Sequence, residues 1–147
     1  MKIRLLEKSD IRAAAAIVGQ NYSERYKRSA TAELRSMFGN AAIKPKYFVA
    51  EKEKAVIGFA GYTQAWMDYS IYEIFWVNVR PEFQRRGVGK LLIAELIEDI
   101  RKQKGARTIL LTADFLKQLP DYYQRGFGFR TILSFGVNYR LMALMLK

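Results

Sequence analysis

The 147-residue sequence contains neither cysteine nor histidine. Without cysteine, the chain can form no disulfide, no cysteine-ligated metal site and no thiol nucleophile. Without histidine, it lacks the commonest general base and metal ligand of proteins. Acid–base chemistry must therefore use Glu, Asp, Tyr, Lys or bound water, and we expect no metal cofactor.

Long apolar segments are missing as well. No run approaches the ~20 apolar residues that span a membrane, and the first residues, MKIRLLEKSD, turn polar too early for a signal peptide. Hydrophobic residues make up 50% of the chain, which suits one compact domain over residues 1–147. The sequence therefore predicts a single-domain cytoplasmic protein with no membrane partner, and it leaves a homodimer open.

Acidic residues are scarce, since the chain has 14 of them against 25 basic residues and a net charge of +11. A charge of this size is typical of nucleic-acid-binding domains. The basic residues are nevertheless scattered in short groups, without a basic tail or an aromatic-basic ribonucleoprotein motif. Nucleic acid is therefore the weaker alternative as a partner.

One stretch, Phe75–Leu92, organises the rest of the chain; it reads FWVNVRPEFQRRGVGKLL. The overlapping run Ile71–Val79 is almost wholly β-branched, aromatic or aliphatic, which predicts a buried strand. Pro81 ends that strand, because proline cannot donate to a ladder. From Val88 onward, apolar residues recur with helical spacing. The pattern predicts a strand, a tight basic turn and a helix with an exposed N-terminus.

That turn has the features of an anion-binding site. The first turn of a helix carries unpaired N–H groups and a partial positive charge, to which Arg85, Arg86 and Lys90 add full charges. Gly87 and Gly89 lack side chains, so a phosphate can approach the backbone itself. A solvated helix start is the simpler alternative.

Two common phosphate motifs do not fit. A P-loop requires Ser or Thr where Leu91 stands, and the dinucleotide fingerprint requires a third glycine at Leu92. What remains is Q-x-x-G-x-G after a strand ending V-x-V-x-P, and this pattern resembles the acetyl-coenzyme A signature of the GNAT N-acetyltransferase superfamily. The resemblance implies acetyl-CoA as cosubstrate and a primary amine as acceptor, with direct transfer in a ternary complex. The cofactor residues that it implies are Val77, Asn78, Val79, Gln84, Arg85, Arg86, Gly87, Val88, Gly89, Lys90 and Asp114.

The predicted strands and helices follow one another in the order βααβββαβαββ. Strands are predicted over Lys2–Leu6, Tyr47–Lys52, Ala55–Gln64, Ile71–Val79, Thr108–Leu111, Phe129–Phe135 and Val137–Leu146, and helices over Ile11–Gly19, Thr31–Phe38, Val88–Gly105 and Phe115–Arg125. The segment Asn21–Arg28 is predicted to be a loop or a broken helix. This order indicates an α/β fold with a mixed central sheet flanked by helices, in which the central helix crosses between two parallel strands. It is the order of a GNAT-like domain.

Glu73 is the candidate general base. It is the only acid in the run Ile71–Val79, and burial there would raise its pKa towards the useful range. Its separation from Gln84 also resembles that of the glutamate base in the histone acetyltransferase branch of the superfamily. The alternative is a structural glutamate that pairs with an arginine or lies exposed at a strand end.

A tyrosine is the implied proton donor to the leaving thiolate, in a segment similar to F-Y-x-x-x-G-F. Alignment on Gly126-Phe127 selects Tyr122, whereas alignment on Gly128-Phe129 selects Tyr123. Only one can face the sulfur, because successive helical residues point about 100° apart. Tyr123 is favoured, because Gly128-Phe129 is better placed before the following strand. Two tyrosines that only pack in the core remain the alternative.

The resemblance further implies that the strand end Val77–Val79 is distorted and splayed, and that its backbone N–H groups stabilise the carbonyl oxygen. The Asn78 side chain either joins them or satisfies a bulge. Asp114 stands where the family often has asparagine, which puts an amide contact to the pantetheine arm in doubt.

Nothing in the sequence identifies the acceptor, so a small molecule, a protein N-terminus and a lysine all stay open. An aromatic group is expected around the acceptor end: Tyr62, Trp66, Tyr69, Tyr72 and Trp76. Much of this group must belong to the core, and the rest can line a pocket for an apolar or aromatic amine. The net charge favours neutral or anionic acceptors, unless Asp68, Glu73 or Asp114 reverses the field inside the pocket. Two other functions are compatible with the chain: a coenzyme A sensor without turnover, which needs neither the glutamate nor the tyrosines, and a basic nucleic-acid-binding domain.

Overall fold

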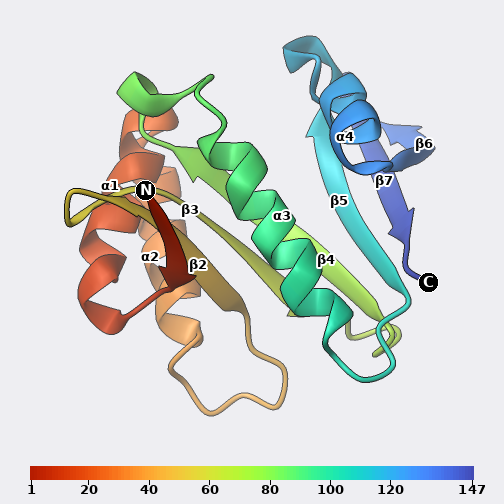
Figure 1. Cartoon of the computed structure of the whole chain (residues 1–147), viewed down its shortest axis with the longest axis horizontal. Coiled ribbons are helices and arrows are strands. Elements are labelled where there is room, and N and C mark those ends of the chain that lie inside the picture. Colours follow the sequence, from red (N-terminus) through yellow and green to blue (C-terminus); the bar gives the residue numbers. More distant parts are fainter.

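The computed structural model describes residues 1–147 and contains seven strands and four α-helices (Figure 1). In chain order the elements are β1 (Lys2–Leu5), η1 (Lys8–Asp10), α1 (Ile11–Asn21), α2 (Glu24–Ser36), β2 (Lys46–Lys52), β3 (Ala55–Gln64), β4 (Ile71–Val79), η2 (Pro81–Phe83), α3 (Val88–Arg101), β5 (Thr108–Asp114), η3 (Phe115–Lys117), α4 (Leu119–Phe127), β6 (Arg130–Phe135) and β7 (Tyr139–Met145), where η marks a short 3₁₀ turn. The predicted order of strands and α-helices is confirmed. No helix combines the length and the apolar character needed to cross a bilayer.

All seven strands form one sheet in the order β1-β2-β3-β4-β5-β7-β6. Only β4 and β5 are parallel neighbours, and α3 connects them, so the predicted mixed sheet with a helical crossover is confirmed. Figure 1 shows α3 across the front of the sheet, with α1 and α2 on the far side. The core accordingly lies in two layers, one under α3 and α4 and the other under α1 and α2.

The second helix begins earlier than the sequence predicts. Ser23 caps α2 by accepting a hydrogen bond from the backbone N–H of Tyr26 at 3.3 Å, and Glu24 places negative charge in the first turn. Of the two structures expected for Asn21–Arg28, the broken helix is therefore the one observed, with the break at residues 22–23, and a loop through the whole segment is wrong. Most of α2 is polar and only Ala30 and Leu34 are buried, so the sequence of its first turns shows little helical hydrophobic periodicity.

The parallel strands β4 and β5 separate soon after they begin. They pair only from Ile71 to Glu73, against Thr108–Leu110. Farther along β4, the register to β3 shifts at Trp76 and the next residue, and Trp76 has a left-handed φ of 52°. Figure 1 shows the two strands diverging towards the end of the sheet where α3 begins. The distortion that the family resemblance implies is therefore present.

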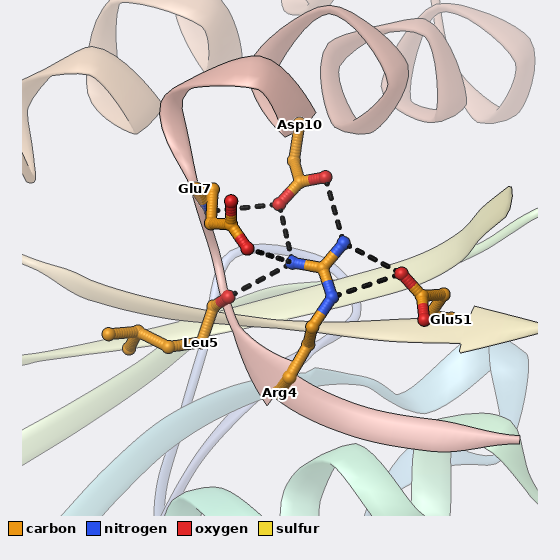
Figure 2. Close-up of polar contacts among 5 residues, drawn as sticks. All are labelled: Arg4, Leu5, Glu7, Asp10 and Glu51. Atoms are coloured by element: carbon orange, nitrogen blue, oxygen red, sulfur yellow. Dashed lines mark hydrogen bonds and ion pairs between the residues drawn. The ribbon is translucent and has the colours of Figure 1, made fainter. Parts of the chain in front are cut away.

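An ion-pair cluster around Arg4 joins three elements at the N-terminal edge (Figure 2). The guanidinium donates to both carboxylate oxygens of Asp10, at 2.7 and 3.0 Å, and to Glu51 of β2 at 3.1 Å. Asp10 also accepts from the backbone N–H of Glu7 at 2.8 Å. The hydrogen bonds from Arg4 hold the pKa of Asp10 below its usual value. The cluster thereby fixes β1, β2 and the start of α1 relative to one another.

Replacing Arg4 with methionine should destabilise the fold by about 3 kcal/mol, because the buried Asp10 carboxylate would lose its partner. For a chain of this size, the corresponding fall in Tm is about 6–12 °C. Since the folded-state pKa of Asp10 is lowered, the stabilisation is present at neutral pH and is lost as the pH falls below about 4. Thermal unfolding at neutral and acidic pH should show the difference between wild type and variant shrinking with acidity.

The matched control is Arg101→Met, which removes an exposed pair with Glu98 at 3.5 Å and should change stability little. Equal losses in the Arg4 and Arg101 variants would show that the cluster contributes no more than an ordinary surface pair.

Candidate active site

The turn before α3 presents a row of unpaired backbone donors. None of the backbone N–H groups from Arg85 to Lys90 donates to another backbone group. Arg85 and Gly87 both adopt left-handed conformations, with φ of 62° and 83°, and a Cβ added at Gly87 would meet no atom within 4 Å. The Val88 side chain is buried in the core, so this residue offers a ligand only its N–H group. The turn is therefore an open concave surface of N–H groups at a helix N-terminus.

Cations surround that turn. Arg85, Arg86 and Lys90 are exposed, and no carboxylate lies within ion-pair distance of them. The ring of Phe83, in η2, is approached by three cations: Lys52 at 5.5 Å, Arg80 at 5.6 Å and Arg86 at 5.9 Å from its centroid. No motif in the sequence connects Lys52 or Arg80 with this site, because both lie outside the turn itself. The electrostatic setting favours a ligand with several negative charges.

Gln84 is bound to the protein at this turn. Its side-chain amide donates to the carbonyl oxygen of Val79 at 3.0 Å and to Asn21 Oδ1 at 3.1 Å. Asn21 in turn donates to Asn78 Oδ1 at 2.9 Å, and to the same Val79 carbonyl at 3.0 Å. These bonds join the end of α1, the end of β4 and the basic turn. The Asn78 side chain is thus buried and accepts a hydrogen bond from Asn21, and its part in stabilising the carbonyl oxygen stays a prediction.

A cleft of about 250 Å³ fills the split between β4 and β5. Its lining residues come from both strands, from the η3–α4 region, from the start of β7 and from the end of α1: Tyr22, Ile74, Phe75, Trp76, Val77, Asn78, Leu111, Thr112, Asp114, Lys117, Leu119, Tyr123 and Tyr139. A second hollow of about 500 Å³ reaches Val79 and Gln84, and it shares several of these residues, among them Tyr22, Val77 and Leu119. The two hollows therefore adjoin, and together they extend from Gln84, beside the basic turn, into the split between β4 and β5; we call this pair of hollows the passage.

The structure separates the two candidate tyrosines. Tyr123 lines the cleft and is only 6% exposed, whereas Tyr122 is 37% exposed and lies outside the cleft lining. Gly128 ends α4 in a left-handed conformation, which brings Phe129 into the core beneath Tyr123. Burial raises the pKa of Tyr123, so its hydroxyl stays protonated at neutral pH. The position of Tyr123 is suited to the expected proton donor, and its role stays a prediction.

Glu73 is exposed, so the expectation that it would be buried is wrong. Side chains alternate along β4, and Glu73 points away from α3 while its neighbours Tyr72 and Ile74 are buried beneath that helix. It lines a separate cavity of about 420 Å³ on the α2 side of the sheet. Phe75 lines both this cavity and the cleft, which places the two spaces next to each other. The role of Glu73 as a base stays a prediction.

Residues 12–129 match the model of the Acetyltransferase (GNAT) family. The chain belongs to this family. Over 86 residues it is 36% identical to an uncharacterized N-acetyltransferase, ycf52, of Gracilaria tenuistipitata var. liui, and the alignment covers 58% of this chain and 43% of that protein. The chain therefore spans less than half the length of this curated relative.

Two solved structures share the fold of this GNAT chain. A GNAT-family protein from Desulfovibrio desulfuricans superposes with a TM-score of 0.84 at 18% identity, and 98% of each chain is covered. The yncA protein of Salmonella typhimurium, solved with its cofactor acetyl-CoA, superposes with a TM-score of 0.74 at 22% identity, and 100% of this chain and 94% of that chain are covered. The predicted GNAT membership and fold are confirmed.

Asp114 lines the cleft, and its Oδ1 accepts from the Leu116 backbone N–H at 2.9 Å and from Asn138 at 2.7 Å, so it also caps η3; its contact with the cofactor stays a prediction. The five aromatic residues expected around the acceptor end are divided between core and surface: Tyr62 and Tyr72 are buried under α3, Trp66 and Tyr69 are exposed, and Trp76 lines the cleft.

Proposed function

We propose that this chain is an N-acetyltransferase that moves an acetyl group from acetyl-CoA to a primary amine while both substrates are bound. The passage from the basic turn to the split between β4 and β5 carries this proposal, because it joins an anion site to a narrow, largely apolar cleft. Membership of an acetyltransferase family supports the same activity.

The residues present fit coenzyme A. The free N–H groups of Arg85–Lys90 and the surrounding cations would hold its phosphates. Tyr22, Val77 and Leu119, which line both parts of the passage, would contact the uncharged arm between the phosphates and the sulfur. When bound, acetyl-CoA supplies the acetyl group as an activated thioester. The hydrogen bonds from Gln84 to Asn21 and from Asn21 to Val79 fix the position of the turn relative to the end of β4, so both contacts can be made at once.

Three groups of the chain would act on the reacting atoms. Only about one lysine-like amine in a few thousand is neutral at pH 7, so a base is needed, and Glu73 takes that proton directly or through water. The backbone N–H groups of Val77–Val79 stabilise charge on the carbonyl oxygen. As the new C–N bond forms and the C–S bond breaks, Tyr123 gives its proton to the sulfur.

The experiment is to incubate the protein with acetyl-CoA and a panel of small amines and peptides, and to follow both free thiol and acetylated amine. Release of thiol in step with acetylated product is the expected result. Tight binding of acetyl-CoA with no product from any amine would instead identify a coenzyme A sensor. Polyanion binding that weakens with salt and ignores coenzyme A would identify a nucleic-acid-binding domain.

Glu73→Gln should lower kcat by about 10²-fold near neutral pH, the low end for a positioned base, because solvent reaches this exposed site and can partly replace the carboxylate. The loss should shrink at high pH, where the amine deprotonates unaided. The affinity for acetyl-CoA should hardly change. Glu95→Gln, on the exposed face of α3, is the matched control. Wild-type kcat in the Glu73 variant at every pH would assign this residue a structural role.

A further inference from the structure

The cavity next to the cleft has a charge opposite to that of the protein. It is lined by Glu33 of α2 and Glu73 of β4, and no basic side chain reaches it. The chain as a whole carries 25 basic and 14 acidic residues, so two carboxylates without a cation create a local field that opposes the net charge. The remaining lining is small or aromatic: Ser36, Pro45, Tyr47, Thr63 and Phe75.

Glu33 accepts a hydrogen bond from Trp76, whose side chain lines the cleft. The indole N–H of Trp76 donates to Glu33 Oε1 at 3.2 Å, and Trp76 is the left-handed residue at the bulge of β4. The bond therefore couples the position of this carboxylate to the distorted part of the strand. No hydrogen bond within the protein reaches the other oxygen of Glu33, so that atom can accept one from a ligand.

Tyr47 adds a polar group with no partner. Its side chain is 0% exposed, and its hydroxyl is the one buried side-chain polar atom of the structure without a hydrogen bond. The ring is held against Gly61, where an added Cβ would come within 2.5 Å of it, and edge-on to Phe75 at a centroid distance of 5.7 Å. Burial, helped by the nearby Glu33 carboxylate, raises the pKa of Tyr47. An unpaired buried hydroxyl is costly, and a bound donor would relieve that cost.

We infer that this cavity binds a second positive charge of the acceptor, while the reacting amine of the same molecule reaches past Phe75 into the cleft. Glu33 and the Tyr47 oxygen can accept hydrogen bonds from an ammonium group, whose charge the carboxylate attracts, while Glu73 stays free to act on the reacting amine. Because the acceptor is defined by acetyl transfer, the assignment rests on the proposed function.

The geometry of β4 also gives a minimum spacing between the two amine groups. Glu73 and Phe75 are neighbours on one face of the strand, about 7 Å apart at two residues per repeat, so an alkyl chain of about five methylenes is the shortest that reaches from this cavity to the cleft. The preference for neutral or anionic acceptors that the net charge predicts is therefore replaced by a preference for dications. Of the three acids that were expected to matter, only Glu73 lies in this cavity, and Glu33 joins it from α2.

The test compares three acceptors of equal chain length and different charge: cadaverine, pentylamine and aminopentanoate. In the wild type, kcat/KM should be highest for cadaverine and lowest for aminopentanoate, and the order should persist as salt rises.

Glu33→Gln should lower kcat/KM for cadaverine about tenfold and leave kcat/KM for pentylamine nearly unchanged. Glu24→Gln removes the same charge from the same helix at a highly exposed position, and it should leave the preference intact. Tyr47→Phe should reduce the preference without loss of stability.

Calorimetric titration of cadaverine and pentylamine into the protein saturated with coenzyme A measures the same preference without turnover. Tighter binding of cadaverine that depends on Glu33 supports the cavity even if no amine is acetylated, and in that event only the proposed function fails. Acetylation of all three amines with equal kcat/KM, or equal binding of cadaverine by the wild type and Glu33→Gln, would overturn the assignment.

Discussion

Gly87→Glu should abolish the thermal stabilisation that acetyl-CoA gives to the wild-type protein. The substitution places a negative side chain on the concave surface of N–H groups, where the account places the phosphates of the cofactor. It also removes the only residue type that adopts the φ of 83° at this turn without strain. The measurement is the shift in Tm on titration with acetyl-CoA.

Gly105→Glu is a closely matched control. Gly105 follows the other end of α3, has the same φ of 83°, and likewise has no atom within 4 Å of an added Cβ. Both variants should lose about 1–2 kcal/mol of stability from the left-handed conformation. Only the Gly87 variant should lose its response to acetyl-CoA. Equal responses in the two variants would show that the cofactor does not bind at this turn.

Tyr123→Phe should lower kcat by about 10³-fold, within the range for a positioned general acid. The Tyr123 side chain is largely buried, so water cannot take the place of its hydroxyl as easily as at the exposed Glu73. The phenylalanine ring preserves the packing on Phe129, and the affinity for acetyl-CoA should change little. Steady-state kinetics and a binding titration separate the two effects.

Tyr122→Phe is the internal control, because it removes the same hydroxyl one residue away and outside the cleft lining. The kcat of this variant should stay within about twofold of the wild-type value, because a hydroxyl outside the cleft cannot reach the sulfur. Equal losses in both variants would mean that the two tyrosines serve only to pack α4. A large loss confined to Tyr122 would reassign the proton donor.

Local patterns were enough to predict the part of the site that lies along one continuous stretch of chain. The run Ile71–Val79 forms β4 over the predicted residues, and α3 begins at the predicted Val88. The turn between them depends on glycine and charge at neighbouring positions, which a sequence displays directly. The pairing of β4 with β5 followed from the crossover order, because a helix between two strands favours a parallel neighbour.

The rest of the site depends on contacts between distant segments. Glu33 reaches Trp76 across 43 positions of the chain, and Gln84 reaches Asn21 across 63. No hydrophobic periodicity in the sequence indicates that either pair is in contact. The exposure of Glu73 was also missed, because an acid in an apolar run reads as buried until both faces of the strand are known. The cavity on the face of β4 that bears Glu73 is completed by Glu33 and Ser36 near the end of α2, so it becomes visible only in the folded structure.

A crystal structure of the protein with acetyl-CoA would show directly whether the N-terminus of α3 and the split between β4 and β5 together hold this cofactor. We expect phosphate oxygens on the N–H groups of Arg85–Lys90, and the thioester between Val77 and Tyr123. The chain also offers a larger basic groove of about 680 Å³ between α1 and α2, lined by Lys8, Arg12, Lys27 and Arg35. Acetyl-CoA bound in that groove, with the α3 turn empty, would contradict the account.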